Sequence, residues 1–452
     1  MFEKKFSKER PYPDDIPYLD HLVSIHPVQT VRATQDIFDQ HKTRLLEQNA
    51  HIDPSSKSTL LSALSQQPLL IPLDHCIALE NELTEPALLA HYRYFLEVFP
   101  QFKRMHGGFE LDDALQSMVA QTLQHPLIAQ KLTVLMLRMP QRFEFSIAVS
   151  WLSMVIALRQ ERSQHQQMSA FIAGLTMDIG YLHLPQASIQ DEETHGNVQA
   201  TDNHPILSWQ ILSTIDTLDP AIAKAVLEHH ERCDGSGFPY GKFRDELGIT
   251  GQIIAMASLV IHHQMPDEPH QQKHLADMLP ALQVNALVHK YEVYETTSIL
   301  CRQWAHAHVT QISEHTIDAY IDRILTKNQL LREWIQHIDE MIMAFANEQE
   351  DRSLLTIKQT YVHILGSAYS SGFLDENYAR WLQHVQKEKV SGVFREIEEV
   401  GLLMDEIEKH LQQTTRLFER LMNQSSTKYE LYEPQINQGL QHIQRLLRNT
   451  KE

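Results

Sequence analysis

The chain has very little cysteine. Its 452 residues include only Cys76, Cys233 and Cys301, and no two of these form a CxxC pair. A disulfide framework needs more cysteines at closer and more regular spacings. The sequence therefore predicts a reducing compartment, and we expect a cytoplasmic protein without disulfides.

Long apolar runs are also missing. The most apolar stretch, 132–139, is much shorter than the roughly 18 apolar residues of a membrane-spanning helix. The N-terminal residues Met-Phe-Glu-Lys-Lys-Phe are not followed by an apolar run, so we see no secretory signal. We expect no membrane span.

Basic residues are too few to balance the acidic ones. There are 39 Lys and Arg against 58 Asp and Glu, which gives a formal net charge of -19. Such a surface repels phosphate backbones, which argues against nucleic acid as a general partner. The net charge does not exclude a local basic pocket for a small nucleotide.

Glycine and strand-like alternation are scarce as well. The chain has 15 glycines, and its apolar residues recur mostly at helical spacing. Hydrophobic residues make up 42% of the chain, which is enough for sizeable cores. We predict an all-α fold with no sheet of more than two short strands.

The length predicts two or three domains, and the patterns favour three. We expect a helical N-terminal domain at 1–130, a motif-bearing domain at 131–308 and a helical C-terminal domain at 309–452. In the first domain we expect an extended lead-in at 1–26 and a helix over 28–48. We find no catalytic motif there, so sensing, dimerisation or docking are its expected roles.

The C-terminal domain carries a heptad pattern. From Ile397 to Leu421 the apolar positions recur at alternating spacings of three and four residues. A second amphipathic pattern covers 436–447. Together they predict a helical hairpin, which is either the edge of a bundle or a seam for a homodimer.

The most specific pattern lies at 226–241 and reads Val-Leu-Glu-His-His-Glu-Arg-Cys-Asp-Gly-Ser-Gly-Phe-Pro-Tyr-Gly. A run of helix formers brings in His229 and His230, and glycines and a proline then impose a tight turn. Paired imidazoles with acidic neighbours suit a divalent metal. Since the chain has 27 histidines, a solvated helix end is the plainer interpretation of the pair alone.

The segment 131–308 resembles the HD-GYP family, helical phosphohydrolases that hydrolyse cyclic di-GMP in bacterial signalling. The family pattern His-His-Glu, two residues, then Asp-Gly-x-Gly-Tyr-Pro matches the stretch from His229 to Pro239, with Phe238 in place of tyrosine. Asp178 stands in the family's His-Asp-Ile-Gly segment, and His204 begins its His-Pro helix. The resemblance implies contacts with GGDEF-type cyclases for the motif loop, namely Asp234, Gly235, Gly237, Phe238 and Pro239.

The resemblance also implies that one metal shell is kept and another is lost. Family sites hold two or three metals, usually iron or manganese. One shell corresponds to Asp178, His204, His229 and His230, and all four ligands are present. We therefore expect either one divalent ion of Fe, Mn, Zn or Ni, or a site without metal.

Ligands of the other shell are replaced. Where the family has two histidines and an aspartate, this chain has Phe145, Met177 and Ser258. The family's lysine after Ile-Gly is Tyr181, and its Arg-Pro-Tyr segment is absent at 262–266. Hydrolysis of a phosphodiester in this family needs a second metal to clamp the phosphate, so we expect no appreciable turnover of cyclic di-GMP.

Three functions are compatible with these observations. The first is a catalytically degenerate HD-GYP protein that acts as an adaptor or regulator in cyclic di-GMP signalling through protein contacts, with a GGDEF-type diguanylate cyclase as a candidate partner. The second is a residual single-metal phosphohydrolase, which the four retained ligands favour. The third is a receptor that binds cyclic di-GMP without cleaving it, which the missing Arg-Pro-Tyr segment disfavours.

Overall fold

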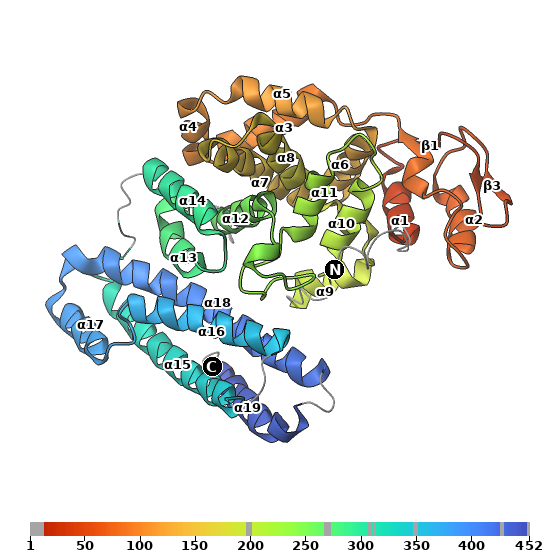
Figure 1. Cartoon of the computed structure of the whole chain (residues 1–452). Helices are drawn as coiled ribbons and strands as arrows, with labels where there is room; N and C mark the ends of the chain where they lie inside the picture. The colour runs from red at the N-terminus through yellow and green to blue at the C-terminus, as the bar shows by residue number, and fades with distance from the viewer. Residues whose placement is uncertain are drawn as a thin grey trace. The chain divides into compact units, whose positions relative to one another are not determined.

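The computed structural model describes residues 13–195, 201–265, 273–305, 310, 312–346, 351–424 and 429–449. These residues are mostly helical (Figure 1). Within these ranges the strands form two antiparallel pairs, β1 (Val31–Ala33) with β4 (Ile77–Leu79) and β2 (Ile37–Phe38) with β3 (Arg44–Leu46). The prediction of an all-α fold without a sheet of more than two strands is confirmed for the described residues.

The chain forms two compact units. The first contains the described residues up to His230 together with Gly248–His262, and the second contains Glu231–Leu247 and the described residues from His263 onward. The chain therefore passes from one unit to the other three times. The three domains expected from the sequence stay a prediction, since this division by packing does not test them.

The first unit is built on the helix pair α7 (Pro140–Arg159) and α8 (Gln164–Thr176), which lie side by side in Figure 1. Most of α7 is buried. A Cβ atom at Gly174 of α8 would lie 2.9 Å from the Ser150 Cα of α7, so glycine permits the close approach of the two helices. The helices that pack on this pair are α3 (Glu85–Val98), α5 (Asp112–Thr122), α6 (Pro126–Arg138) and α11 (Pro220–Glu228). The unit also contains α4 (Pro100–Gly108), α9 (Gln186–His195), α10 (His204–Leu212) and most of α12 (Ile249–Gln264).

Two expectations for the N-terminal residues are wrong. The lead-in contains helix α1 (Asp15–Ile25), whose first turn is capped by the Asp14 carboxylate accepting from the Ile16 N–H; residues 1–12 of the lead-in lie outside the described residues. The helix expected over 28–48 is replaced by β1, β2 and β3. Asp39 accepts from the backbone N–H groups of His41 and Thr43, which stabilises a turn between β2 and β3 instead of a helix. Helix α2 (Pro54–Leu64) follows, with Asp53 as its N-cap.

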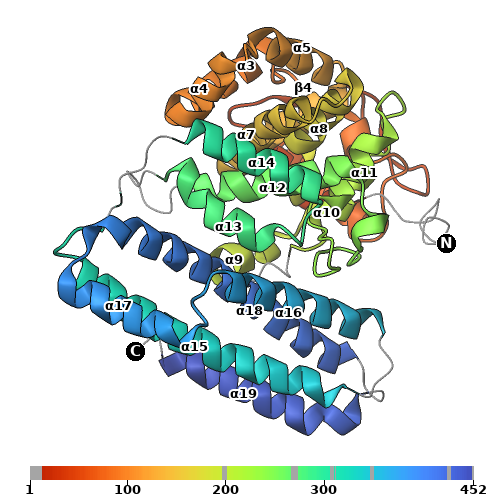
Figure 2. The ribbon, with the colours of Figure 1, turned by 60° about the vertical axis from the view of Figure 1, so that its left-hand side comes forward.

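The second unit is a helical bundle. Its long helices are α15 (Ile317–Ala344), α16 (Arg352–Ser370), α18 (Phe394–Gln424) and α19 (Glu433–Asn449), which lie side by side in Figures 1 and 2. Shorter helices complete it: α13 (Met278–Asn285), α14 (Tyr291–Trp304) and α17 (Glu376–Glu388).

The heptad seam of α18 is buried inside this bundle. Its apolar positions Ile397, Met404, Ile407, Leu411, Phe418 and Leu421 belong to one core that also holds Trp334 of α15. The consecutive helices α18 and α19 touch, while α19 also packs on α15; residues 425–428 between them lie outside the described residues. A homodimer through these helices, which stays a prediction, would have to use surfaces other than this seam.

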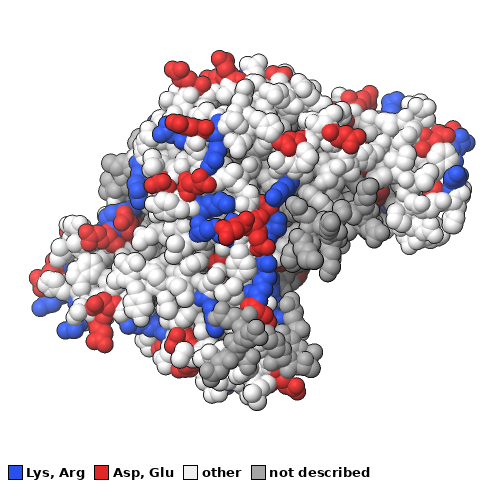
Figure 3. Space-filling view, in the orientation of Figure 1, with Lys and Arg blue, Asp and Glu red and all other residues white. Residues whose placement is uncertain are grey.

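Charged side chains are interspersed on the surface. On the face shown in Figure 3, Lys and Arg side chains lie among Asp and Glu side chains in small mixed groups. All three cysteines are buried thiols. Within the described part of the chain, no helix combines the length and the apolar character needed to cross a membrane.

Candidate metal centre

The end of α8 and the start of α10 are held together by close backbone packing. After Thr176 the chain leaves α8, passes Met177 and Asp178, and enters the 3-10 helix η3 (Ile179–His183). A Cβ atom at Gly180 would lie 2.3 Å from the His204 carbonyl oxygen, so only glycine fits there. The Ser208 hydroxyl accepts from the Gly180 N–H at 2.8 Å and donates to the Met177 carbonyl at 2.7 Å. This packing places the first residue of α10, His204, beside Asp178.

The other two histidines lie at the C-terminal end of a helix, whereas His204 lies at the N-terminal end of one. Helix α11 starts after the N-cap Asp219, whose carboxylate accepts from the Ala221 N–H, and it ends at Glu228. His229 is the C-cap residue and His230 follows it. Because α10 and α11 pack against each other, the start of one and the end of the other bring all three imidazoles to one place.

The structure brings the four predicted ligands together. The Nε2 atom of His204 lies 3.3 Å from Nε2 of His229, 3.2 Å from Nε2 of His230 and 3.5 Å from Oδ1 of Asp178. Nε2 of His229 is 3.9 Å from the same carboxylate oxygen. Asp178, His204 and His229 are buried, and His230 is partly exposed. The ligand atoms of the three histidines all lie within 4.8 Å of one another, and Asp178 lies beside two of them, His204 and His229; their role as metal ligands stays a prediction.

Backbone hydrogen bonds fix how two of the imidazoles are protonated. Nδ1 of His204 lies 2.8 Å from the Thr201 carbonyl, and Nδ1 of His229 lies 2.6 Å from the Val226 carbonyl. A carbonyl only accepts, so each Nδ1 carries the proton and, in the neutral imidazole, Nε2 carries a lone pair. Burial lowers the pKa of His204 well below its usual value, followed by the effect of the His229 charge, which keeps this imidazole neutral. Two lone pairs that face each other at 3.3 Å are stabilised when a cation lies between them.

The donor set and spacing fit a first-row divalent ion. For a tetrahedral ion about 2.1 Å from each ligand atom, neighbouring ligand atoms are about 3.4 Å apart. The distances from His204 to the other three ligand atoms, 3.2, 3.3 and 3.5 Å, are close to this value, and His229 lies 3.9 Å from Asp178; the three imidazoles by themselves have all their ligand atoms within 4.8 Å of one another. A carbonyl that orients the far nitrogen is also the usual second partner of a metal-binding histidine. Three imidazoles and a carboxylate suit Zn, Fe, Mn or Ni.

A cationic group that the sequence analysis missed lies beside Asp178. Burial raises the pKa of Asp178 to about 6, and the positive charge of Arg142 opposes that rise. The Arg142 guanidinium lies over the Tyr181 ring, 3.4 Å from its centroid, and donates to Glu192 Oε2 at 2.8 Å. The Tyr181 hydroxyl donates to Glu192 Oε1 at 3.4 Å, and the Tyr181 ring lies 4.4 Å from the His204 ring.

A sequence signal for Arg142 did exist. It stands in the first turn of α7, where the positive end of the helix dipole disfavours a cation. A basic residue there needs a nearby anion, and in the sequence Arg142 precedes Phe145, one of the lost ligand positions, by one helical turn. The identity of that anion follows only from the tertiary structure.

Two of the three replaced positions are in contact with each other. The Ser258 hydroxyl of α12 lies 3.7 Å from the Met177 sulfur, within range of a weak hydrogen bond. Met177 is buried, whereas Ser258 is partly exposed. Phe145 is partly exposed on α7. None of the three offers a nitrogen or carboxylate ligand. The loss of a second metal shell at these positions stays a prediction.

The motif loop belongs to the second unit and is held by its own acidic residues. Glu231 is fully buried and accepts from the backbone N–H groups of Tyr240 and Lys242 at 2.7 and 2.8 Å. Burial would raise the pKa of Asp234, but the His363 imidazole 3.7 Å away and hydrogen bonds from Ser236 outweigh it and lower this pKa to about 2. The Thr360 hydroxyl of α16 also donates to Asp234 at 3.0 Å. Asp234 is therefore ionised and fixes the loop on α16.

The predicted partner-contact residues of this loop differ in exposure. Asp234 and Gly235 are buried, and Gly235 has a φ of 79°, which favours glycine. Gly237, Phe238 and Pro239 are partly exposed. A contact with a partner, which stays a prediction, is therefore available to the second half of the loop and not to the first.

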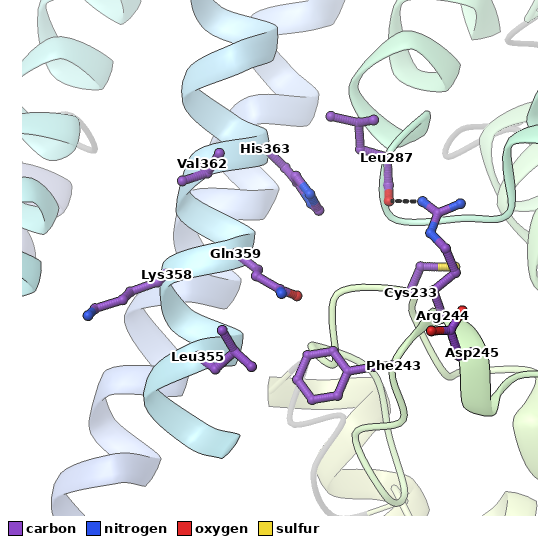
Figure 4. A pocket seen from close by; sticks show the side chains of 10 residues that line it. All are labelled: Cys233, Phe243, Arg244, Asp245, Leu287, Leu355, Lys358, Gln359, Val362 and His363. Carbon is purple, nitrogen blue, oxygen red and sulfur yellow. Dashed lines mark hydrogen bonds between the residues drawn. The ribbon is translucent and has the colours of Figure 1, made fainter. Parts of the chain in front are cut away.

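Residues on both sides of the motif loop form one wall of a cavity of about 510 Å³ (Figure 4). One helical face of α16 lines the opposite wall with Leu355, Lys358, Gln359, Val362 and His363. The loop side contributes Cys233, Phe243, Arg244 and Asp245, and Leu287 completes it. Arg244 donates to the Leu287 carbonyl at 3.2 Å, as Figure 4 shows. All of these residues belong to the second unit.

Comparison with known proteins gives a family match and distant relatives. Residues 113–292 match the model of the HD domain. The cyclic di-GMP phosphodiesterase PA4108 of Pseudomonas aeruginosa is 25% identical over 209 residues, which cover 44% of this chain and 50% of that protein. The cyclic di-GMP phosphodiesterase of Thermotoga maritima is 32% identical over 114 residues, covering 24% of this chain and 30% of that protein. For the cyclic di-GMP phosphodiesterase PdeB of Borreliella burgdorferi the identity is 28% over 109 residues, with 23% and 28% covered.

The matches thus span half or less of the length of these relatives. The HD match at 113–292 includes the segment that carries the histidine triad, His204, His229 and His230. HD domains bind metals, and this buried triad can hold one. Residues 113–292 form an HD domain with distant homology to the HD-GYP cyclic di-GMP phosphodiesterases.

Proposed function

We propose that this chain is a catalytically degenerate HD-GYP protein that regulates cyclic di-GMP signalling through protein contacts and keeps a single metal centre. Asp178, His204, His229 and His230 would hold the ion, which supplies positive charge when bound. The observation that carries the proposal is the contrast between these four converging donors and the thioether–hydroxyl contact of Met177 with Ser258.

The absence of hydrolysis follows from what the chain's own residues offer. Phosphodiester cleavage by a two-ion clamp needs donors for two ions, which lie about 3.5–4 Å apart in such sites. Asp178 together with His204, His229 and His230 offers enough donors for one ion. At the predicted positions of the other, Phe145 and Met177 are apolar and Ser258 offers a neutral hydroxyl. A regulatory role is compatible with this arrangement, because such a role requires a folded metal centre but no hydrolysis of cyclic di-GMP.

The test combines metal analysis with a turnover assay on the full chain. We expect up to one divalent ion per chain after incubation with Mn²⁺, Fe²⁺, Zn²⁺ or Ni²⁺, and no appreciable hydrolysis of cyclic di-GMP. The His229→Ala variant should lose the ion, and His41→Ala, which changes an exposed histidine, should keep it. A robust rate that disappears in His229→Ala would contradict the proposal.

Protein contacts are tested separately with a partner. The resemblance suggests a GGDEF-type diguanylate cyclase, and Gly237, Phe238 and Pro239 are the partly exposed part of the motif loop. We expect a purified cyclase to bind the full chain in a calorimetric titration, and Phe238→Ala to weaken that binding. Equal binding by the variant and the wild type would remove the loop from the proposal.

A second candidate is a single-metal phosphohydrolase that acts on another phosphoester. The observation that favours it is the position of Arg142 over the Tyr181 ring, which lies 4.4 Å from the His204 ring, because a fixed cation near one ion can attract a phosphate group. The test is turnover of p-nitrophenyl phosphate and bis(p-nitrophenyl) phosphate by the metal-loaded chain. Metal-dependent turnover that His229→Ala abolishes would support this candidate, and its absence for both substrates would remove it.

A further inference from the structure

We propose that Arg142 and Tyr181 form an oxyanion-binding subsite beside the histidine triad, and that the Glu192 carboxylate occupies this subsite until a ligand's phosphate group replaces it. The inference rests on the proposed retention of the metal centre. It adds the class of ligand, a phosphate-bearing molecule, and a residue that controls access to the site.

The first support is the set of contacts that the Arg142 guanidinium makes. Its flat face covers the Tyr181 ring at 3.4 Å, and one edge donates to Glu192 at 2.8 Å. The planar fork of a guanidinium matches carboxylate and phosphate oxygens equally well. The Glu192 carboxylate thus makes the contact with Arg142 that a phosphate would make.

The second support is a row of stacked groups that connects Arg142 with the triad. Arg142 lies over Tyr181, and the Tyr181 ring lies 4.4 Å from the His204 ring with 31° between the planes. His204 in turn is 3.2–3.3 Å from the other two imidazoles. The guanidinium is therefore one ring away from the first ligand of the centre.

The third support is the gradient of exposure along this row. The His204 side chain is 3% exposed and the Asp178 side chain 7%, whereas Arg142 is 23% exposed and Glu192 20%. Solvent reaches the row at the end where the ion pair lies. A ligand anchored at the triad would meet the guanidinium on its way in.

Glu192 is suited to leave the subsite. Its two carboxylate oxygens contact Arg142 at 2.8 Å and the Tyr181 hydroxyl at only 3.4 Å. Its helix α9 is anchored near Tyr181 through the buried Ile189, one turn before Glu192. The side chain can therefore rotate toward solvent while the helix stays in place. A phosphate dianion carries one charge more than the carboxylate and competes for the same donors.

The experiment measures binding of phenylphosphonate, an unhydrolysable phosphate-ester analogue, to the full chain loaded with Mn²⁺, by isothermal titration calorimetry. Glu192→Gln keeps the side-chain shape and removes the competing charge, so we expect about tenfold tighter binding, as for loss of one charge-assisted hydrogen bond. Arg142→Gln should weaken binding about tenfold or more, and Arg142→Lys should give an intermediate affinity. The control is Glu97→Gln, which removes the carboxylate of the exposed pair with Lys103 in the same unit and should leave the affinity unchanged.

A gain in affinity cannot result from unfolding, so Glu192→Gln keeps the test decisive even if Arg142→Gln folds poorly. Binding by Glu192→Gln that is no tighter than in the wild type would overturn the subsite and leave the proposed function standing. Detection of cyclic di-GMP turnover, which this ligand does not report, would contradict the proposed function and leave the subsite standing.

Discussion

Single residues decide the chemistry of the metal centre. The Thr201 and Val226 carbonyls each hold one imidazole with its proton on Nδ1, and the Asp178 carboxylate lies 3.5 Å from His204 and 3.9 Å from His229. The neighbouring residue Met177 offers a thioether, which is a poor ligand for the ions considered above. Asp178, a predicted ligand, and Met177, which is not one, are therefore adjacent in the chain.

Restoring one ligand should not restore turnover. Met177→His replaces a buried thioether next to Ser258 with an imidazole. We expect cyclic di-GMP hydrolysis to stay at background, because Phe145 and Ser258 still supply no donor, and we expect a loss of about 1–3 kcal/mol in stability from the buried polar group. The measurement is a hydrolysis assay in Mn²⁺ with denaturant unfolding beside it. Substantial turnover by this single variant would show that the second shell is less depleted than the sequence indicates.

Asp15 in α1 should make stability depend on pH. Burial, followed by the nearby charge of Asp74, raises the pKa of Asp15 to about 7. Between about pH 4 and pH 7 the folded state then keeps a proton that the unfolded state releases, so folding weakens as the pH rises through this window and levels off above it. Asp15→Asn cannot ionise and escapes this loss.

We therefore expect Asp15→Asn to be more stable relative to the wild type at pH 8 than at pH 5. The difference should be about 1–3 kcal/mol, since a tenfold change in proton affinity corresponds to about 1.4 kcal/mol. Urea unfolding at both pH values measures it. A difference that is equal at the two pH values would rule out ionisation of Asp15 as the cause.

At the scale of elements, the centre depends on how η3 packs on α10. Gly180 sits against the His204 carbonyl and the Ser208 backbone, and these contacts set where α10 begins relative to Asp178. The ligands are therefore positioned by backbone contact between two elements that are separated in sequence by α9.

Gly180→Ala should damage metal binding more than folding. The added Cβ would lie 2.3 Å from the His204 oxygen and 2.7 Å from the Ser208 nitrogen, both backbone atoms, so α10 must shift and carry His204 with it. We expect metal affinity to fall about tenfold or more, as for loss of a supporting contact of a ligand. Gly107→Ala in α4 is the matched control, because nothing lies within 4 Å of its Cβ. Unchanged affinity in Gly180→Ala would mean that α10 is not held by this contact.

A buried ion pair joins the N-terminal elements to η3. The Lys131 ammonium of α6 is fully buried, 2.7 Å from Asp74, 2.8 Å from the His183 ring and 3.3 Å from the centroid of the Tyr18 ring. Burial lowers the pKa of Lys131 and the charge of Asp74 opposes this. The four residues come from α1, the 3-10 helix η2 (Leu73–His75), α6 and η3.

Removing one member of this pair should cost more than removing both. Lys131→Met leaves the Asp74 carboxylate buried without its cation, and we expect a loss of about 3–5 kcal/mol. The double variant Lys131→Met with Asp74→Leu removes both charges of the pair and should lose less. Denaturant unfolding of both variants checks this, and a double variant at least as unstable as the single one would contradict the argument.

At the scale of the whole molecule, the ligands all lie in one unit and the motif loop in the other. The motif that is continuous in sequence, from His229 to Pro239, is thus divided between two units at His230 and Glu231. Of these eleven residues, His229 and His230 belong to the candidate metal centre, and those from Glu231 onward form the loop that Asp234 fixes on α16.

Metal should stabilise the chain in proportion to its binding. At a free ion concentration one hundred times Kd the stabilisation is about 2.7 kcal/mol, and for a unit of this size that corresponds to a rise of about 5–10 °C in Tm. We expect this rise with Mn²⁺ or Zn²⁺ in a thermal scan and its absence in His204→Ala. An equal rise in both proteins would assign the ion to another site.

The sequence by itself determined the features that depend on local chemistry. Asp219-Pro220 and His204-Pro205 mark the starts of α11 and α10, because a cap and an N-terminal proline act within one helical turn. The spacing of the motif around His229 indicated the HD-type segment, which the family match at 113–292 confirms. The helical fold class followed from periodicity, which is also a local property.

Only the tertiary structure decided the features that depend on contacts between distant residues. The apolar pattern of 28–48 did not reveal that an Asp39 turn and pairing with β4 give strands there. The packing of α7 on η3 places Arg142 over Tyr181, close to Asp178. The apolar seam of α18 is buried only because the other helices of the bundle surround it. Helix packing and the close contact at Gly180 likewise decide which of the 27 histidines lie together. Local propensities carry no information about which helix ends become neighbours.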